Sequence, residues 1–246
     1  MPNRPMQALI LAGGKGTRLR PYTTVFPKPL MPVGDHPILE IILRQLKHAG
    51  LARITLAVGH MSQMFRAFFG DGSALGLELS YSVEQEALGT AGPIALALDQ
   101  LEDDFLVMNG DLLTTLPYRK LLDDHCRSGA SATIALYSRE VKVDFGVIET
   151  QGEELSKYRE KPVLQFDVSM GVNVLKKRDV APYLQPGRYL DIPDLMMRMR
   201  NDGKKVRCFR SPCIWLDIGR IDDYEAATGI LESHRSEFLP EDPVWR

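Results

Sequence analysis

Runs of apolar residues alternate with segments of helical periodicity through the first half of the chain. Gln7–Ala12 is a short apolar run, which is the pattern of a strand buried on both faces. Pro37–Ala49 carries apolar residues at helical spacing and ends beside Gly50, which predicts a helix. The same alternation predicts further strands and helices at Arg53–Val58, Ser62–Phe69 (with Ser62 as the N-cap), Leu77–Val83, Thr90–Leu98, Phe105–Met108, Pro117–Cys126 and Ala132–Leu136.

The pattern changes after residue 136, where three strand-like stretches are separated by short turns. These stretches, Phe145–Glu149, Glu154–Tyr158 and Gln165–Leu175, predict antiparallel strands beside the parallel sheet. The fold class we expect is α/β, with a doubly wound, mostly parallel, Rossmann-like sheet and a small antiparallel insertion. The alternation then resumes with a helix at Ile192–Arg200, strands near Lys204–Phe209 and Ile214–Asp217, and a last helix at Asp222–His234.

Composition narrows the class of protein. With 246 residues, 44% of them hydrophobic, and no linker rich in proline, glycine or serine, we expect one domain over residues 1–246. A net charge of −2 argues against nucleic acid as a partner, and no apolar run reaches the roughly 18 residues that span a membrane. Three cysteines without a Cys-x-x-Cys pair indicate buried thiols in a reducing, cytoplasmic compartment. A homo-oligomer is left open.

The loop after the first strand carries the strongest functional signal. Residues 13–20 hold three glycines and the basic residues Lys15, Arg18 and Arg20. Backbone amides that glycines leave accessible, together with cations, make a site for a polyphosphate. The spacing matches neither the P-loop nor the dinucleotide fingerprint. A tight basic turn without a ligand is the alternative.

Three further charged residues stand at defined places. Lys28 lies between two prolines, which predicts an extended backbone that holds one ammonium group in place. Asp111 and Asp217 each follow an apolar strand, as ligands of Mg²⁺ often do. Alternatively, Lys28 is an ordinary surface lysine and Asp111 caps a turn or a helix.

Together, Gly-Gly-Lys-Gly-Thr-Arg-Leu-Arg-Pro at residues 13–21 and Pro-Lys-Pro at 27–29 resemble the signature of the sugar-1-phosphate nucleotidyltransferases, the nucleotide-sugar pyrophosphorylases. The resemblance covers nearly the whole chain. It implies transfer of a nucleoside monophosphate from a nucleoside triphosphate to a sugar 1-phosphate, with Arg18 and Lys28 as catalytic residues. It also implies Mg²⁺ held by Asp111 and Asp217. The implied nucleotide-binding residues are Leu11, Ala12, Gly13, Gly14, Gly16, Thr17, Glu84, Gly89, Thr90 and Asn109.

By the same resemblance, residues 1–135 form the nucleotide-binding half, 136–220 the sugar-binding half, and 221–246 a C-terminal helix and tail. Glu160-Lys161-Pro162 matches a motif whose acid contacts sugar hydroxyls and whose lysine binds the sugar phosphate. Ser169 stands where the family commonly has asparagine, which puts that contact in doubt. The implied sugar-phosphate residues are Gly146, Glu160, Lys161, Gly171 and Asn173.

The base is inferred from Glu84, which aligns where relatives that use UTP or dTTP carry glutamine. A carboxylate only accepts hydrogen bonds, and guanine presents two adjacent donors, so Glu84 favours GTP. A shift of one residue would put Gln85 there instead. Leu-Gly-Thr-Ala-Gly at residues 88–92 also resembles the mannose- and heptose-1-phosphate guanylyltransferases. We expect no appended repeat domain.

Three alternatives are a UTP- or dTTP-dependent glucose-1-phosphate enzyme, a catalytically silent regulatory subunit, and a guanylyltransferase for a non-sugar phosphate. The intact charged set argues against the silent subunit; it comprises Arg18, Lys28, Asp111, Lys161 and Asp217. The motifs on the sugar side argue against the non-sugar substrate.

Overall fold

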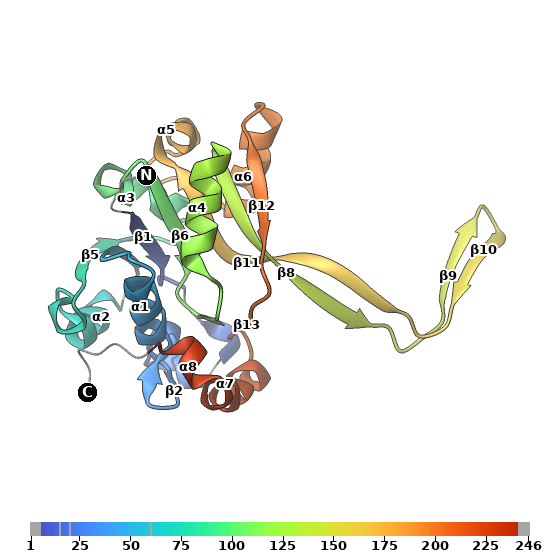
Figure 1. The fold of residues 1–246 in the computed structure, drawn as a ribbon, viewed down its shortest axis with the longest axis horizontal. Coiled ribbons are helices and arrows are strands. Elements are labelled where there is room, and N and C mark those ends of the chain that lie inside the picture. The colour runs from blue at the N-terminus through green and yellow to red at the C-terminus, as the bar shows by residue number, and fades with distance from the viewer. Residues whose placement is uncertain (1–5, 15, 20, 60, 241–246) are drawn as a thin grey trace.

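A seven-stranded sheet lies at the centre of the molecule (Figure 1). The computed structural model describes residues 6–14, 16–19, 21–59 and 61–240. The strands of the sheet are β1 (Gln7–Leu11), β4 (Arg53–Val58), β5 (Glu78–Val83), β6 (Asp104–Asn109), β8 (Ala132–Lys142), β11 (Val163–Lys176) and β12 (Val206–Arg210). Their order is β12-β8-β11-β6-β1-β4-β5, and β11 runs antiparallel to both of its neighbours while the other pairs are parallel.

Helices cover both faces of this sheet because successive side chains of a buried strand point to opposite sides. Ala8 and Ile10 of β1 belong to one apolar core and Leu9 to a second core. The helices are α1 (Ile38–His48), α2 (Ser62–Phe69), α3 (Gly92–Ala97), α4 (Tyr118–Ser128), α5 (Lys177–Val180), α6 (Ile192–Asn201), α7 (Ile221–Ser233) and α8 (Arg235–Phe238). The first core contains residues of α1, α2, α4, α7 and α8, and the second those of α3, α5 and α6. The predicted doubly wound α/β class is confirmed.

Two short antiparallel pairs accompany the main sheet. β2 (Pro32–Val33) pairs with β3 (His36–Pro37). β7 (Leu112–Thr114), which directly follows β6, pairs with β13 (Trp215–Asp217), so that Leu112 faces Asp217. The second pair matters for the site because it joins the two halves of the chain beside the carboxyl end of β6.

A long ribbon leaves the body of the molecule (Figure 1). β8 and β11 pair from Ala132 opposite Leu175 to Lys142 opposite Val163, but β12 covers β8 only as far as Leu136. Beyond that point the two strands continue outward and end in a hairpin of β9 (Val147–Gln151) and β10 (Glu154–Arg159). We call residues 137–168 the arm.

Three expectations need correction. The predicted strand at Gln165–Leu175 lies inside the sheet, because β11 finds hydrogen-bonding partners on both of its edges, in β6 and β8. The strands predicted at residues 145–158 pair with each other at the end of the arm. Ser62 is the first residue of α2, Met61 holds the N-cap position, and no side chain caps this helix.

The thiols also differ from expectation. Cys126 and Cys208 are exposed and Cys213 is partly buried.

Among the described residues, no helix combines the length and the apolar character that crossing a bilayer takes.

Candidate active site

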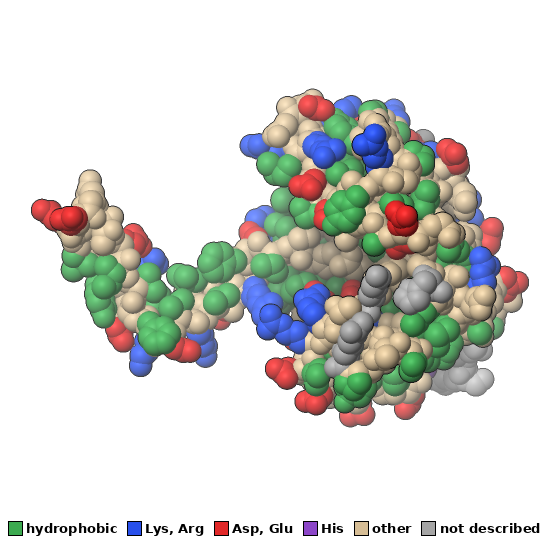
Figure 2. Space-filling view, turned by 180° about the vertical axis from the view of Figure 1, so that it is seen from behind, with side chains coloured by type: hydrophobic (Ala, Val, Ile, Leu, Met, Phe, Trp, Pro, Cys, Tyr) green, Lys and Arg blue, Asp and Glu red, His purple; other side chains and the backbone are tan. Residues whose placement is uncertain are grey.

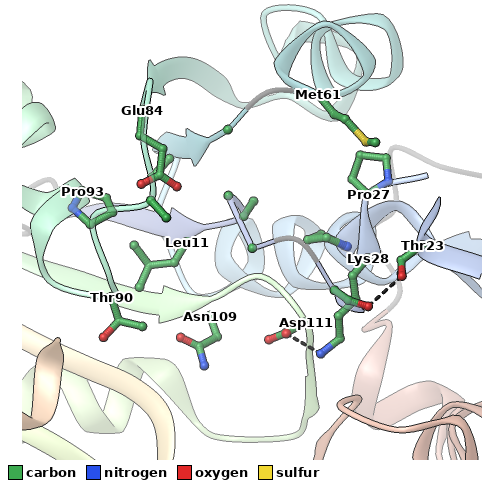
Figure 3. Close-up of a pocket in the computed structure, with 18 of the residues that line it drawn as sticks. Leu11, Thr23, Pro27, Lys28, Met61, Glu84, Thr90, Pro93, Asn109 and Asp111 are labelled. Atoms are coloured by element: carbon green, nitrogen blue, oxygen red, sulfur yellow. Dashed lines mark hydrogen bonds and ion pairs between the residues drawn. The ribbon is translucent and has the colours of Figure 1, made fainter. Parts of the chain in front are cut away.

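A pocket of about 1140 Å³ lies along one edge of the sheet. The parallel strands β1, β4, β5 and β6 all end at this edge, where open α/β sheets bind ligands. Figure 2 shows the body hollowed near the base of the arm, and Figure 3 shows the interior. The lining includes all of the sequence-predicted nucleotide-binding residues, namely Leu11, Ala12, Gly13, Gly14, Gly16, Thr17, Glu84, Gly89, Thr90 and Asn109. Arg18, Lys28 and Asp111 line it as well.

The glycine loop enters the pocket directly from β1. Gly16 has a φ of +58°, a conformation that favours glycine, and its carbonyl accepts a hydrogen bond from Thr23 Oγ1 at 2.7 Å. A 3-10 turn at Thr17–Leu19 follows and leaves Arg18 exposed at the pocket. Lys15 and Arg20, which the sequence also assigned to this basic loop, lie outside the described residues.

Lys28 is 6% exposed, and its ammonium group is fixed by acids. The backbone is extended at Pro27, as the flanking prolines predict, but Lys28 itself opens a 3-10 turn over Lys28–Leu30. The turn forms because the amide of Leu30 donates to the carbonyl of Pro27 at 2.9 Å. Lys28 Nζ lies 2.6 Å from Asp111 Oδ2 and 3.9 Å from Asp217 Oδ1.

The pairing of β7 with β13 brings Asp111 and Asp217 together. Leu112 pairs with Asp217, and the amide of Ile218 donates to the carbonyl of Asp111 at 3.2 Å. Burial and the nearby carboxylate of Asp111 raise the pKa of Asp217, while Lys28 and Arg18 oppose the rise.

The two aspartates fit a magnesium ion. Asp111 Oδ1 is buried and has no hydrogen-bond partner among the described residues. Mg²⁺ takes one or two carboxylates and completes its shell with phosphate oxygens and waters. Among the described residues, no three or more His, Cys, Asp or Glu side chains are placed so that they could together hold a metal ion.

Glu84 follows β5 and lies at the opposite end of the pocket from Lys28 and Asp111 (Figure 3). Its carboxylate packs so closely on Gly13 that a Cβ there would collide with Glu84 Oε1. Glu84 Oε2 accepts a hydrogen bond from the amide of Leu88 at 3.3 Å. Burial raises the pKa of this carboxyl. Gln85 also lines the pocket, but its side chain is exposed.

Sequence reasoning missed Asp191 and Tyr189, which also line the pocket. Asp191 Oδ1 accepts from the amide of Thr90 at 3.0 Å and from Thr90 Oγ1 at 3.1 Å, and Oδ2 accepts from Tyr189 Oη at 2.7 Å. Thr90 Oγ1 in turn accepts from the amide of Ile192 at 2.8 Å. Locally, Asp191 has only the signal of a helix N-cap, since its partner Thr90 is 101 residues away.

The residues predicted for the sugar phosphate are dispersed. Gly171 lies at a bulge of β11 with φ of +72°, and a Cβ there would stand 2.7 Å from Asn109 Nδ2, so it borders the pocket. Asn173 is 1% exposed within the sheet. Gly146, Glu160 and Lys161 lie on the arm, away from the pocket lining.

The arm residues nevertheless form a local cluster. Tyr158 Oη donates to Glu160 Oε2 at 3.2 Å, and a Cβ at Gly146 would lie 3.0 Å from that same oxygen. Among the described residues, Lys161 alone has a positive φ without being glycine, at +43°. We call Gly146, Tyr158, Glu160 and Lys161 the arm cluster.

Comparisons with known proteins agree with this architecture. The nucleotidyl transferase family model matches residues 7–234. The chain is 33% identical to a mannose-1-phosphate guanylyltransferase of Mycobacterium tuberculosis, over 98% of the chain and 72% of the relative. It is 30% identical to a UTP–glucose-1-phosphate uridylyltransferase of Synechocystis, over 92% of the chain and 63% of that relative.

A solved Bacillus anthracis structure, assigned as a glucose-1-phosphate thymidylyltransferase and holding sucrose, superposes with a TM-score of 0.75 at 25% identity. The match covers 96% of each chain. The described strands, the glycine loop and the family match all agree, and the chain belongs to the nucleotidyl transferase family.

Proposed function

We propose that the protein transfers a guanosine monophosphate group from GTP to a mannose- or heptose-like sugar 1-phosphate and releases pyrophosphate. Family membership and the size of the pocket support a nucleotide substrate with a second, smaller one beside it. The name of the mycobacterial relative supports guanine and mannose.

The position of Glu84 carries the choice of base. Its carboxylate lies at the end of the pocket opposite Lys28 and Asp111, which suits a base whose phosphates extend toward those two residues. A carboxylate that accepts two parallel hydrogen bonds complements N1–H and the 2-amino group of guanine. The amide of Leu88, which donates to Glu84 Oε2, orients that carboxylate.

In this reaction a phosphate oxygen of the sugar 1-phosphate attacks the α-phosphorus of the nucleotide in line. The protein must therefore mainly position the two substrates and neutralise their negative charge. Arg18 is exposed at the glycine loop and would bind the β- and γ-phosphates as they leave. Lys28 would offset negative charge at the transferring phosphorus, and Lys161 would bind the sugar phosphate. Asp111 and Asp217 would hold Mg²⁺, which neutralises charge on the phosphates when bound.

A second candidate is the UTP- or dTTP-dependent reaction with glucose 1-phosphate. It is favoured by Gln85, which lines the pocket beside Glu84 and could both donate to and accept from a pyrimidine. The uridylyltransferase from Synechocystis is also among the similar proteins.

Release of pyrophosphate tests both candidates. GTP, UTP, dTTP, CTP and ATP would each be combined with mannose, glucose and heptose 1-phosphates in the presence of Mg²⁺. We expect a clear preference for GTP. A preference for UTP or dTTP would indicate that Gln85, and not Glu84, contacts the base. Nucleotide binding without turnover of any sugar phosphate would instead support a silent regulatory subunit.

A further inference from the structure

The arm exposes many large apolar side chains. Seven of the 15 exposed large apolar side chains in the described part of the chain lie on these 32 residues. A two-stranded ribbon has no core of its own and is marginally stable alone, so such a surface marks a docking site. Figure 2 shows these hydrophobic side chains along the arm. They are Val141, Phe145, Ile148, Leu155, Tyr158, Val163 and Phe166.

The described part of the body does not cover this surface. The pairing of β8 with β11 continues without a break from Leu136 opposite Ser169 to Lys142 opposite Val163. The ribbon is therefore a continuous extension of the central sheet, directed away from the body (Figure 1). At about 3.3 Å per residue, residues 137–142 alone carry it roughly 20 Å past the last residue of β8 that β12 covers.

The arm cluster has the chemistry of a binding site. Glu160 and Lys161 are exposed, and Glu160 is oriented by Tyr158. The left-handed backbone of Lys161 costs about 1–3 kcal/mol, a strain that proteins retain mainly at functional sites. An exposed ammonium suits a phosphate monoester, and a carboxylate suits sugar hydroxyls.

The described lining of the pocket contains few cationic side chains and receives none from the arm of its own chain. Its buried cation, Lys28, is engaged by Asp111 and Asp217, which leaves Arg18 as its other described cation. Two phosphorylated substrates bring several negative charges, and a further ammonium group on the sugar-phosphate side would bind one of them. Among the described residues that line the pocket, none comes from the arm.

We propose that the arm of one copy docks on a second copy of the chain and delivers Glu160 and Lys161 to the sugar-phosphate side of that copy's pocket. The proposal rests on the proposed function for the substrate and on the arm's surface for the partner. In a dimer with two-fold symmetry, each arm docks on the partner copy and each pocket receives one arm. Exchange of identical elements is a common route to dimers.

The surfaces are large enough for such a dimer. An aromatic side chain buries about 150–250 Å² when fully covered, and Phe145, Tyr158 and Phe166 are each at least half exposed. With the four aliphatic residues, two arms offer apolar area on the order of 1,000 Å², within reach of the roughly 1,200–2,000 Å² of stable interfaces. The pocket rim supplies apolar partners, since Tyr189 is 65% exposed and Val25 is 75% exposed between two lining residues.

The mass in solution, measured by light scattering after gel filtration, is the first test. We expect twice the 27.6 kDa of one chain for the wild type, and the single-chain mass for Phe166→Ser. Met197→Ser on α6 is the matched control, because Met197 is 52% and Phe166 50% exposed. A monomeric wild type, or a dimer that Phe166→Ser leaves intact, would overturn the proposal.

Complementation tests delivery to the second copy. Arg18→Ala damages a pocket and Lys161→Ala damages an arm, and both residues are exposed, so neither change should disturb folding. Heterodimers of the two variants, isolated through two different tags, contain one site with an intact pocket and an intact arm. We expect about half of the wild-type turnover from them and almost none from either variant alone. If the heterodimers were no more active than the two single variants while the wild type was active, each arm would act on the pocket of its own chain. That outcome would overturn the proposal.

Cross-linking separates this proposal from the proposed function. A photo-reactive benzoylphenylalanine at Phe145 should, after irradiation, give a denatured species of twice 27.6 kDa whose cross-link maps near Val25 or Tyr189. This readout needs no activity. If the cross-link appeared but the wild type formed no pyrophosphate, the result would support docking of the arm on a second copy. It would contradict the proposed nucleotidyltransferase reaction. A cross-link found only within one chain would overturn the docking.

Discussion

Individual charges in the pocket are held by packing as well as by one another. Lys28 is almost fully buried, and its ammonium group is compensated by Asp111 and, at a longer distance, by Asp217. Removing one partner of a buried pair leaves an uncompensated charge and typically costs about 3–5 kcal/mol. Substitutions at Lys28 or Asp111 therefore mix effects on stability with effects on turnover, whereas Arg18 is exposed and separates them.

Arg18→Ala should lower kcat by roughly 100- to 1,000-fold, the usual cost of losing one group that stabilises developing charge. The melting temperature should stay within about 2 °C of the wild type, since an exposed side chain is lost. Arg119→Ala on α4, another exposed arginine, is the control that should leave both quantities unchanged. Near-normal turnover of Arg18→Ala would remove this residue from the catalytic set.

Glu84 should make the use of GTP depend on pH. Burial raises the pKa of its carboxyl, so it takes up a proton at a higher pH than an exposed glutamate, whose pKa is about 4.3. A protonated carboxyl no longer accepts two hydrogen bonds, and the KM for GTP should rise as the pH falls from neutral to about 5.

Glu84→Gln provides the comparison for that measurement. Glutamine does not titrate, so the variant's KM should be flat over the same range and should favour UTP over GTP. An unchanged base preference in Glu84→Gln would assign the base to Gln85 or to another group.

Among the structural elements, the loop at residues 88–92 and the segment at 189–192 form one unit. Asp191 accepts three hydrogen bonds from Thr90 and Tyr189, and the carbonyl of Leu190 accepts from the amides of Ala91 and Gly92 at 2.8 and 3.0 Å. The start of α6 thereby fixes the loop that borders the Glu84 end of the pocket.

Asp191→Ala should raise the KM for the nucleotide roughly 10-fold with a smaller change in kcat, because the loop loses its anchor. It should also lower stability by about 1–3 kcal/mol, since two partly buried donors of Thr90 lose their acceptor. Asp194→Ala, an exposed acid in the first turn of the same helix, is the control for kinetics and melting. Equal effects of the two changes would contradict the anchoring role.

The sequence predicted those structural elements whose conformation depends on residues close by along the chain. The buried β1, the helix α1 and the loop that bends at Gly16 follow from local periodicity and from glycine. The contact of Asp191 with Thr90 spans 101 residues and leaves no local pattern. The arm was missed because the segment at residues 138–142 is mostly polar and does not continue the apolar pattern of the strand predicted at Ala132–Leu136, and only the pairing with β11 extends β8 to Lys142.

For the whole molecule, an exchanged arm makes activity depend on protein concentration. Specific activity should fall when the enzyme is diluted below the dissociation constant of the dimer, because each pocket then loses the arm cluster of its partner. The amides of the arm should lose protection from hydrogen exchange over the same dilution range, while those of β1 and β6 stay protected. Activity that is independent of dilution, in a protein shown to become monomeric, would contradict this dependence.

The pairing of β7 with β13 also has a consequence for how the protein folds. Thr114 Oγ1 bonds to the carbonyl of Ile214, 100 residues away along the chain. Contacts of such long sequence separation form late, because a large loop must close first. Asp217 should therefore join Lys28 and Asp111 as one of the last steps. In refolding from denaturant, helical ellipticity should recover first and turnover only afterwards, once this pair of strands has closed.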